Sequence, residues 1–161
     1  MYTFICQIQQ GKADHERGKD MLKPKILVVD DQLGIVSFLY DFFTPKNYEV
    51  LQATSGRKAL QLVKKESPAV VLLDIKLGWG KDGMQVLEEI KGVAPETRVI
   101  MMTSIADEEV IEKAFNLGAD DYVVKPFSLS YLEKVVMLKI LDLQIRNLGK
   151  GGNGTPSERN I

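Results

Sequence analysis

Several features that mark particular classes of protein are scarce in this sequence. Its 161 residues include one cysteine, Cys6, which excludes an intramolecular disulfide and a metal site built from several cysteines. The longest apolar runs, among them 69–73 and 99–102, are far shorter than the roughly 20 residues of a membrane-spanning helix. Because 21 basic and 22 acidic side chains leave a net charge of −1, we expect no general attraction to nucleic acid or to membranes. The first residues also lack the basic start of a signal peptide, so we expect a soluble cytoplasmic protein.

The composition divides the chain into three parts. Residues 1–22 include a polar stretch without hydrophobic periodicity and are predicted to be a disordered leader. Residues 149–161 are rich in glycine and polar residues and are predicted to be a flexible tail. The patterned block between them, 23–148, has the length of one domain.

Within this block, short apolar runs alternate with segments of helical spacing. Five runs predict strands, and several of them lack polar alternation, as in parallel sheets that are covered on both faces. Helical spacing fills the segments between and after them. This alternation predicts an open, doubly wound α/β sheet of five strands and five helices. The predicted strands are 25–30, 48–53, 69–74, 98–103 and 121–124.

Polar residues with a common chemistry stand where these strands end. Asp30 and Asp31 follow the first strand, Asp74 ends the third, Thr103 ends the fourth and Lys125 follows the fifth. The functional crevice of such a sheet lies at the carboxyl ends of its strands. In the flavodoxin-like order 2-1-3-4-5, the first and third strands are neighbours, so the three carboxylates would converge. Crowded carboxylates repel one another, and an all-oxygen site suits Mg²⁺, so we expect this ion there.

The same strand ends hold what phosphoryl transfer requires. Asp74 can act as a nucleophile toward phosphorus and form an aspartyl phosphate. Lys125 supplies a compact positive charge, and the hydroxyl of Thr103 can donate to a phosphoryl oxygen. Phosphoryl transfer asks a protein mainly for positioning and charge neutralisation, so this short set is chemically sufficient.

Four stretches, in matching order and spacing, resemble the receiver domain of two-component response regulators. The likeness extends over about residues 23–145 and implies a flavodoxin-like sheet of order 2-1-3-4-5 with five helices. One departure is the loop after Asp74, which is a residue longer than usual and has Gly78 where the family has proline, followed by Trp79. The four stretches are Ile-Leu-Val-Val-Asp-Asp at 26–31, Val-Leu-Leu-Asp-Ile at 71–75, Val-Ile-Met-Met-Thr-Ser at 99–104 and Gly-Ala-Asp-Asp-Tyr-Val-Val-Lys-Pro-Phe at 118–127.

The resemblance implies a role for each matching residue of the metal site. Asp74 would be the phosphoacceptor and a ligand of Mg²⁺. Asp30 and Asp31 would hold the ion, one of them directly and the other through water. The backbone carbonyl of Lys76 would be a further ligand.

The resemblance implies further roles close to this metal site. Lys125 would bind the phosphoryl group, and a cis peptide bond is expected before Pro126. Thr103 would move toward the phosphoryl group while Tyr122 swings inward, so that the two act as a switch. Ser104 would be the small residue that leaves room for the phosphoryl group.

The function that follows is that of a receiver, which is a phosphoacceptor that assists its own phosphorylation and dephosphorylation rather than an enzyme. The expected donor is a histidine kinase or a phosphotransfer protein. The signal would pass through the face of the fourth helix, fifth strand and fifth helix to a downstream protein target, or to a second copy in a homodimer. Two alternatives remain open: a receiver that is a piece of a longer regulator or hybrid kinase, and an interaction module that works without phosphorylation.

Residues at individual positions disfavour two other classes of protein. A Mg²⁺-dependent phosphatase that uses an aspartyl phosphate usually has a second Asp two residues beyond the nucleophile, and Lys76 stands there. A nucleotide- or flavin-binding domain would need a glycine-rich phosphate loop after the first strand, where Asp30 and Asp31 stand instead.

The last predicted helix carries one more pattern. Leu141, Ile145 and Leu148 continue an apolar stripe with spacings of four and three residues. Two interpretations remain open: the stripe continues the core-facing edge of the helix, or it extends the helix to pair with another copy or to lead into an output domain.

Overall fold

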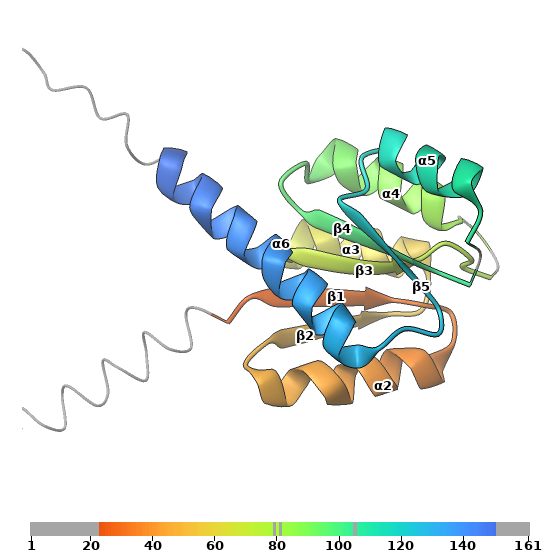
Figure 1. The fold of residues 1–161 in the computed structure, drawn as a ribbon, viewed down its shortest axis with the longest axis horizontal. Coiled ribbons are helices and arrows are strands. Elements are labelled where there is room, and N and C mark those ends of the chain that lie inside the picture. Colours follow the sequence, from red (N-terminus) through yellow and green to blue (C-terminus); the bar gives the residue numbers. More distant parts are fainter. Residues whose placement is uncertain (1–22, 79, 81, 105, 151–161) are drawn as a thin grey trace, which may run out of the picture.

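A computed structural model of the chain describes residues 23–150, except 79, 81 and 105. Five strands and five α-helices alternate along it, with a short 3₁₀ segment after the first helix (Figure 1). The predicted leader and most of the predicted tail lie outside the described residues. The elements are β1 (Lys25–Val29), α2 (Leu33–Phe43), η1 (Thr44–Lys46), β2 (Glu49–Ala53), α3 (Gly56–Glu66), β3 (Val70–Asp74), α4 (Gly83–Val93), β4 (Arg98–Thr103), α5 (Glu108–Asn116), β5 (Asp121–Val124) and α6 (Leu129–Lys150).

The strands form one parallel sheet of order β2-β1-β3-β4-β5, which confirms the predicted fold class. Each predicted strand agrees with the observed one to within one residue at either end. The sheet places β1 between β2 and β3, so β1, which is followed by the acidic pair, is a direct neighbour of β3, which ends in Asp74.

Helices cover both faces of the sheet, which explains why the central strands lack polar alternation. Side chains of alternate strand residues point to opposite faces. Leu27 and Leu73 pack with α3, α4 and α5 on one face, whereas Ile26 and Leu72 pack with α2 and α6 on the other. Every residue of β3 and β4 is buried as a result.

Local signals fix where the helices begin. The Ser55 side chain accepts a hydrogen bond from the Lys58 amide at the start of α3. At the start of α4, Asp82 and Gln85 form a reciprocal capping box, so two amides at the helix start have partners. This box sets the point at which the loop after β3 turns into α4.

Candidate functional site

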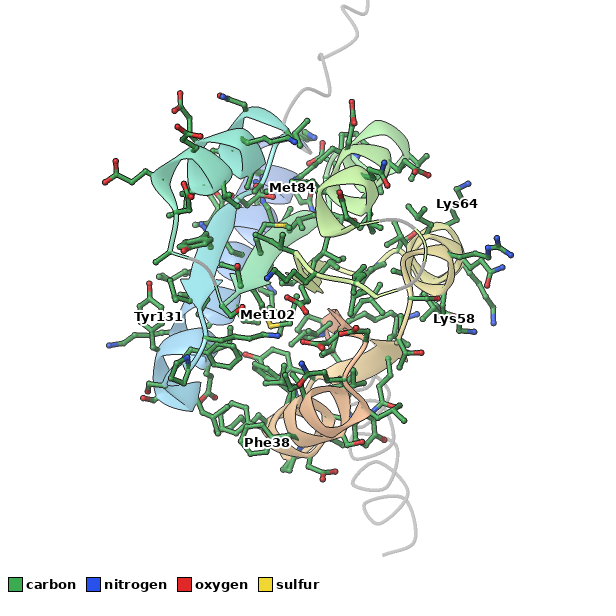
Figure 2. All side chains as sticks on the ribbon, turned by 90° about the vertical axis from the view of Figure 1, so that its right-hand side faces the viewer. Phe38, Lys58, Lys64, Met84, Met102 and Tyr131 are labelled. Carbon is green, nitrogen blue, oxygen red and sulfur yellow. The ribbon has the colours of Figure 1, made fainter. Side chains whose placement is uncertain are left out.

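Three carboxylates meet at the carboxyl edge of the sheet. Asp30 follows β1, Asp31 comes next, and Asp74 is the last residue of the neighbouring β3. One carboxylate oxygen from each of the three lies within 4.8 Å of those of the other two. Figure 2 views the molecule from the side toward which the β1 arrow points in Figure 1, so this edge faces the reader. The predicted convergence of the three acids is therefore confirmed.

The three acids differ in burial and in their partners. Asp30 is fully buried, and its Oδ1 accepts a hydrogen bond of 2.9 Å from the amide of Gln32. Asp31 is exposed, and its Oδ2 accepts one of 3.1 Å from the amide of Gly78 in the loop after β3. Asp74 is buried but borders the pocket described below. The arrangement places one carboxylate below the pocket and two at its surface.

Lys125 reaches into this cluster from the end of β5. Its Nζ lies 2.6 Å from Oδ2 of Asp30 and 3.5 Å from Oδ2 of Asp74. Its amide donates to the carbonyl of Thr103 at 2.6 Å, which ties the start of this loop to the end of β4. The Lys125–Pro126 peptide bond is cis. A single ammonium group thus faces two buried carboxylates.

The electrostatics of the cluster favour a further cation. Burial raises the pKa of Asp74 and the negative charge of Asp30 raises it further, although Lys125 and the backbone amide of Lys76 oppose this. One ammonium group also stands against three ionisable carboxyl groups, so Lys125 alone cannot balance their charge when all are ionised. A set of carboxylate oxygens without sulfur or imidazole suits a hard divalent ion such as Mg²⁺.

A pocket of about 370 Å³ opens over Asp74. Asp74 thus borders an open pocket although most of its surface is buried. The lining of the pocket consists of Asp31, Gln32, Ile35, Asp74, Lys76, Ser104 and Lys125.

Gly83, the first residue of α4, packs against the backbone that follows Asp74. Its amide donates to the carbonyl of Ile75 at 2.8 Å. A Cβ atom at this position would lie 2.2 Å from the carbonyl oxygen of Asp74 and 2.7 Å from the Cα of Ile75. Contacts this short with backbone atoms leave no room for a side chain, so Gly83 fixes where the loop after β3 can run.

The predicted site residues fall into two groups in the structure. The metal-site acids, Lys76, Ser104 and Lys125 gather around the pocket. Thr103 is buried at the end of β4, while Tyr122 is half-buried on β5 against the core beneath α3, α4 and α5. Their switch role stays a prediction, and Trp79 lies outside the described residues.

Sequence reasoning missed that Gln32 and Ile35 line the pocket and that Gly83 packs against the backbone of Asp74. Gln32 and Ile35 line the pocket because α2 starts directly after Asp31 and its first turn stands at the rim. Their position immediately after the acidic pair was the signal available. For Gly83, no local signal gives its approach to the backbone of β3.

Within the described part of the chain, no helix combines the length and apolar character needed to cross a membrane.

Comparisons with known proteins agree with this geometry. The family model described as the response regulator receiver domain matches residues 26–137. Sporulation initiation phosphotransferase F of Bacillus subtilis is 39% identical over 116 residues, which are 72% of this chain and 93% of that protein. Regulatory protein AtoC of Escherichia coli is 37% identical over 128 residues, which are 77% of this chain and only 28% of AtoC.

Solved structures show the same likeness. A CheY-like response regulator receiver domain from Methanospirillum hungatei superimposes with a TM-score of 0.74 at 28% identity, covering 77% of this chain and 98% of that one. The BeF₃-activated DrrB receiver domain gives a TM-score of 0.69 at 33% identity, covering 74% of this chain and 99% of that one. With a matching family model, fold and acidic site, the chain belongs to the response regulator receiver domains of two-component signalling.

Proposed function

We propose that Asp74 accepts a phosphoryl group from a phosphohistidine of a histidine kinase or phosphotransfer protein. The observation that carries this proposal is the pocket above Asp74, where its carboxylate adjoins two other carboxylates and the ammonium group of Lys125. An oxygen of Asp74 forms the new bond to phosphorus as the bond between phosphorus and the donor histidine nitrogen breaks. The protein is then a phosphoacceptor that assists its own phosphorylation and dephosphorylation rather than an enzyme with a separate substrate.

Mg²⁺ is the cofactor of this proposal. Asp30, Asp31 and Asp74 would hold it, because one carboxylate oxygen of each lies within 4.8 Å of the others. The backbone carbonyl of Lys76, a residue that lines the pocket, would be a further ligand. When bound, the ion would neutralise the crowded carboxylates and stabilise negative charge on the phosphoryl group. Lys125 binds a phosphoryl oxygen, and Ser104 leaves space beside the reacting group.

The signal leaves the site through the residues at the ends of β4 and β5. The hydroxyl of Thr103 turns toward the phosphoryl group, and the ring of Tyr122 follows it inward. Both strands border α5 and α6, so the α5–β5–α6 face changes shape. This face then binds a downstream protein target or a second copy of the chain.

Two exposed apolar side chains of α2, the helix that begins beside the pocket, suit the donor protein. Leu33, in the first turn of α2, is 70% exposed although it follows the acidic pair by only two residues. Phe38 is also exposed and lies on the outer side of α2 in Figure 2. A donor protein that docks on α2 would bury these side chains, and this burial favours association. The sporulation phosphotransferase is named for phosphoryl transfer, and by this likeness we include onward transfer to a phosphotransfer histidine in the proposal.

Incubation with acetyl phosphate and Mg²⁺ tests the phosphoacceptor directly. We expect a mass gain of one phosphoryl group in the unmodified protein and none in Asp74→Ala. Asp41→Ala is the control, because it removes an exposed carboxylate from α2, away from the pocket, and is expected to keep the gain. An unchanged mass in the unmodified protein would favour an interaction module that works without phosphorylation.

Lys125 and an incoming cation compete for the same carboxylates. Lys125→Met is therefore expected to raise the affinity of the unphosphorylated protein for Mg²⁺ by about ten-fold, since a positive charge 2.6 Å from Asp30 is removed. Isothermal titration calorimetry measures this affinity.

Lys76→Met is the matched control for this charge effect. Lys76 also lines the pocket, but its exposed side chain forms no ion pair with a described residue. We expect its loss to change the affinity by no more than about two-fold, because exposed charges are well screened. Equal effects of the two variants would contradict the specific competition by Lys125.

A further inference from the structure

The loop after β3 holds the exposed carboxylate of the acidic cluster. The amide of Gly78 donates a hydrogen bond of 3.1 Å to Oδ2 of Asp31. Asp30 and Asp74 are buried, so neighbouring atoms already restrict their side chains, whereas the exposed side chain of Asp31 would otherwise keep its rotamer freedom. The hydrogen bond therefore acts on the carboxylate of the cluster that burial restrains least.

Gly78 permits this contact because it has no side chain. A Cβ atom at this position would lie 3.0 Å from Oδ2 of Asp31, and contacts this short force the neighbouring atom to shift. Proline, which the family has at this position, would also remove the donor, because its backbone nitrogen carries no hydrogen. Glycine thus supplies the donor and leaves space for the acceptor.

Neighbouring residues of the loop fix the position of this amide. Leu77, the residue before Gly78, is buried and packs in the core beneath α3, α4 and α5. Further along the loop, the amide of Gly83 donates to the carbonyl of Ile75 at 2.8 Å, which closes the loop at its base. The core therefore anchors the backbone that presents the Gly78 amide to Asp31.

The two carboxylate oxygens of Asp31 differ in their partners. The amide of Gly78 occupies Oδ2, whereas Oδ1 accepts no hydrogen bond from the described residues. One oxygen of Asp31 lies within 4.8 Å of an oxygen from each of the other two acids, so this carboxylate is held at the cluster before an ion binds. Hydrogen bonds that orient a metal ligand typically contribute roughly 10- to 100-fold to metal affinity.

We propose that the backbone amide of Gly78 is a positioning group for Asp31, which orients this carboxylate for Mg²⁺ and so couples the metal site to the loop after β3. The inference rests on the proposed function, because it takes Mg²⁺ as the ion of the site. Gly78 makes no contact with the ion in this proposal, and its amide acts only through Asp31. Loss of the amide hydrogen is therefore expected to matter only while the carboxylate of Asp31 is present.

A double-mutant cycle on metal affinity tests this dependence. Mn²⁺ is the probe, because it prefers the same oxygen ligands as Mg²⁺ and gives an electron paramagnetic resonance signal while it is free in solution. Gly78→Pro removes the amide hydrogen and is expected to weaken binding by about ten-fold. In the Asp31→Ala background, the same substitution is expected to change the affinity by less than about two-fold. An equal loss in both backgrounds overturns the proposal, since proline would then disturb the site in another way.

Gly78→Ala separates the amide hydrogen from the space around it. Alanine keeps the hydrogen but adds the Cβ atom that approaches Oδ2 of Asp31, and this exposed side chain can shift to make room. We expect a smaller loss of affinity than in Gly78→Pro, and urea unfolding checks that both variants remain folded. A loss in Gly78→Ala as large as that in Gly78→Pro would contradict a role of the amide hydrogen.

The unmodified protein offers a test that needs no variant. Coupling between two binding events is reciprocal, so saturating Mg²⁺ is expected to slow hydrogen exchange of the Gly78 amide by up to about ten-fold. Nuclear magnetic resonance measures this rate, and a rate that Mg²⁺ leaves unchanged overturns the proposal. None of these measurements uses a phosphoryl donor, so their failure is distinct from a failure of phosphorylation at Asp74, which is measured by mass.

Discussion

Gly83→Ala is expected to lower the free energy of unfolding by about 3 kcal/mol, near the upper end of the usual cost of overpacking. The added Cβ would lie 2.2 Å from the carbonyl oxygen of Asp74, so either α4 or the end of β3 must move. That movement displaces the phosphoacceptor. We therefore also expect phosphorylation by acetyl phosphate to slow by about ten-fold or more, since small misplacements of a reacting group are costly.

Gly92→Ala is the matched control because it makes the same change in the same helix. Apart from its chain neighbours and the backbone of its own helix, no atom lies within 4 Å of the position of its Cβ, and the residue is exposed near the end of α4. Alanine is the better helix former, so we expect this variant to gain about 0.5 kcal/mol and to react at the normal rate. Urea unfolding and phosphorylation kinetics measure both quantities. If the two alanine variants behave alike, the close contact at Gly83 does not constrain the site.

The sheet could be predicted from the sequence because burial on both faces leaves a clear trace. A strand such as β3 needs an apolar residue at nearly every position, since its side chains point alternately into two cores. The run therefore stops where the strand stops, and the first polar residue marks the carboxyl edge. This is why Asp30 and Asp74 could be placed at one site without any knowledge of their contacts.

The contacts that shape the site could not be predicted in the same way. The amide of Gly78 binds Asp31, which is 47 residues away, and no local preference encodes this pairing. The approach of Gly83 to the backbone of Asp74 depends on the path of the whole loop between them. Sequence patterns predict which face of a helix or strand is buried. They do not predict the path of a loop or the distant residues that the loop contacts.

The end of the last helix shows a similar limit. Gly149 suggested that a tail begins there, yet α6 continues to Lys150. Glycine costs a helix only about 1 kcal/mol relative to alanine, so neighbouring interactions can outweigh it. Here Lys150 also pairs with Glu96, which is 54 positions away and was not visible as a local signal.

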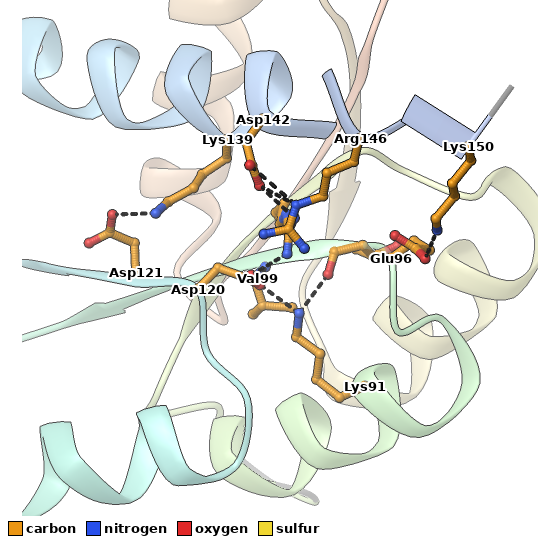
Figure 3. A network of polar contacts seen from close by, with 11 residues as sticks. Lys91, Glu96, Val99, Asp120, Asp121, Lys139, Asp142, Arg146 and Lys150 are labelled. Carbon is orange, nitrogen blue, oxygen red and sulfur yellow. Dashed lines mark hydrogen bonds and ion pairs between the residues drawn. The ribbon is translucent and has the colours of Figure 1, made fainter. Parts of the chain in front are cut away.

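Asp120→Asn is expected to lower the free energy of unfolding by about 3 kcal/mol at pH 7, because it leaves two largely buried cations without their shared carboxylate. Asp120 lies 2.5 Å from Nζ of Lys91 and 2.8 Å from Arg98, and it also accepts a hydrogen bond from the amide of Val99 (Figure 3). The carboxylate thus joins α4, β4 and the start of β5. Its neighbour Asp121 pairs with Lys139 in a more exposed position, so Asp121→Asn is the control and is expected to cost less than about 1 kcal/mol.

The pH dependence identifies the charge of Asp120 as the cause. Burial acts to raise the pKa of Asp120, but the hydrogen bonds and charges of Lys91, Val99 and Arg98 outweigh burial and hold it below the usual value. A carboxyl group with a lowered pKa stabilises the folded state above its unfolded pKa of about 3.9, and this stabilisation is lost as the pH falls through the folded pKa. The stability difference between the unmodified protein and Asp120→Asn is therefore expected to be constant from pH 7 to about pH 5 and to shrink below that.

The position of Asp120 separates stability from signalling chemistry. Asp120 precedes β5, at the edge of the sheet opposite the pocket over Asp74. Asp120→Asn is therefore expected to keep the rate of phosphorylation by acetyl phosphate at temperatures where it stays folded, whereas Gly83→Ala loses both stability and rate. Urea unfolding at several pH values, together with phosphorylation kinetics, distinguishes the two variants. A stability difference that does not change with pH would show that packing around Asp120, rather than its charge, holds these elements together.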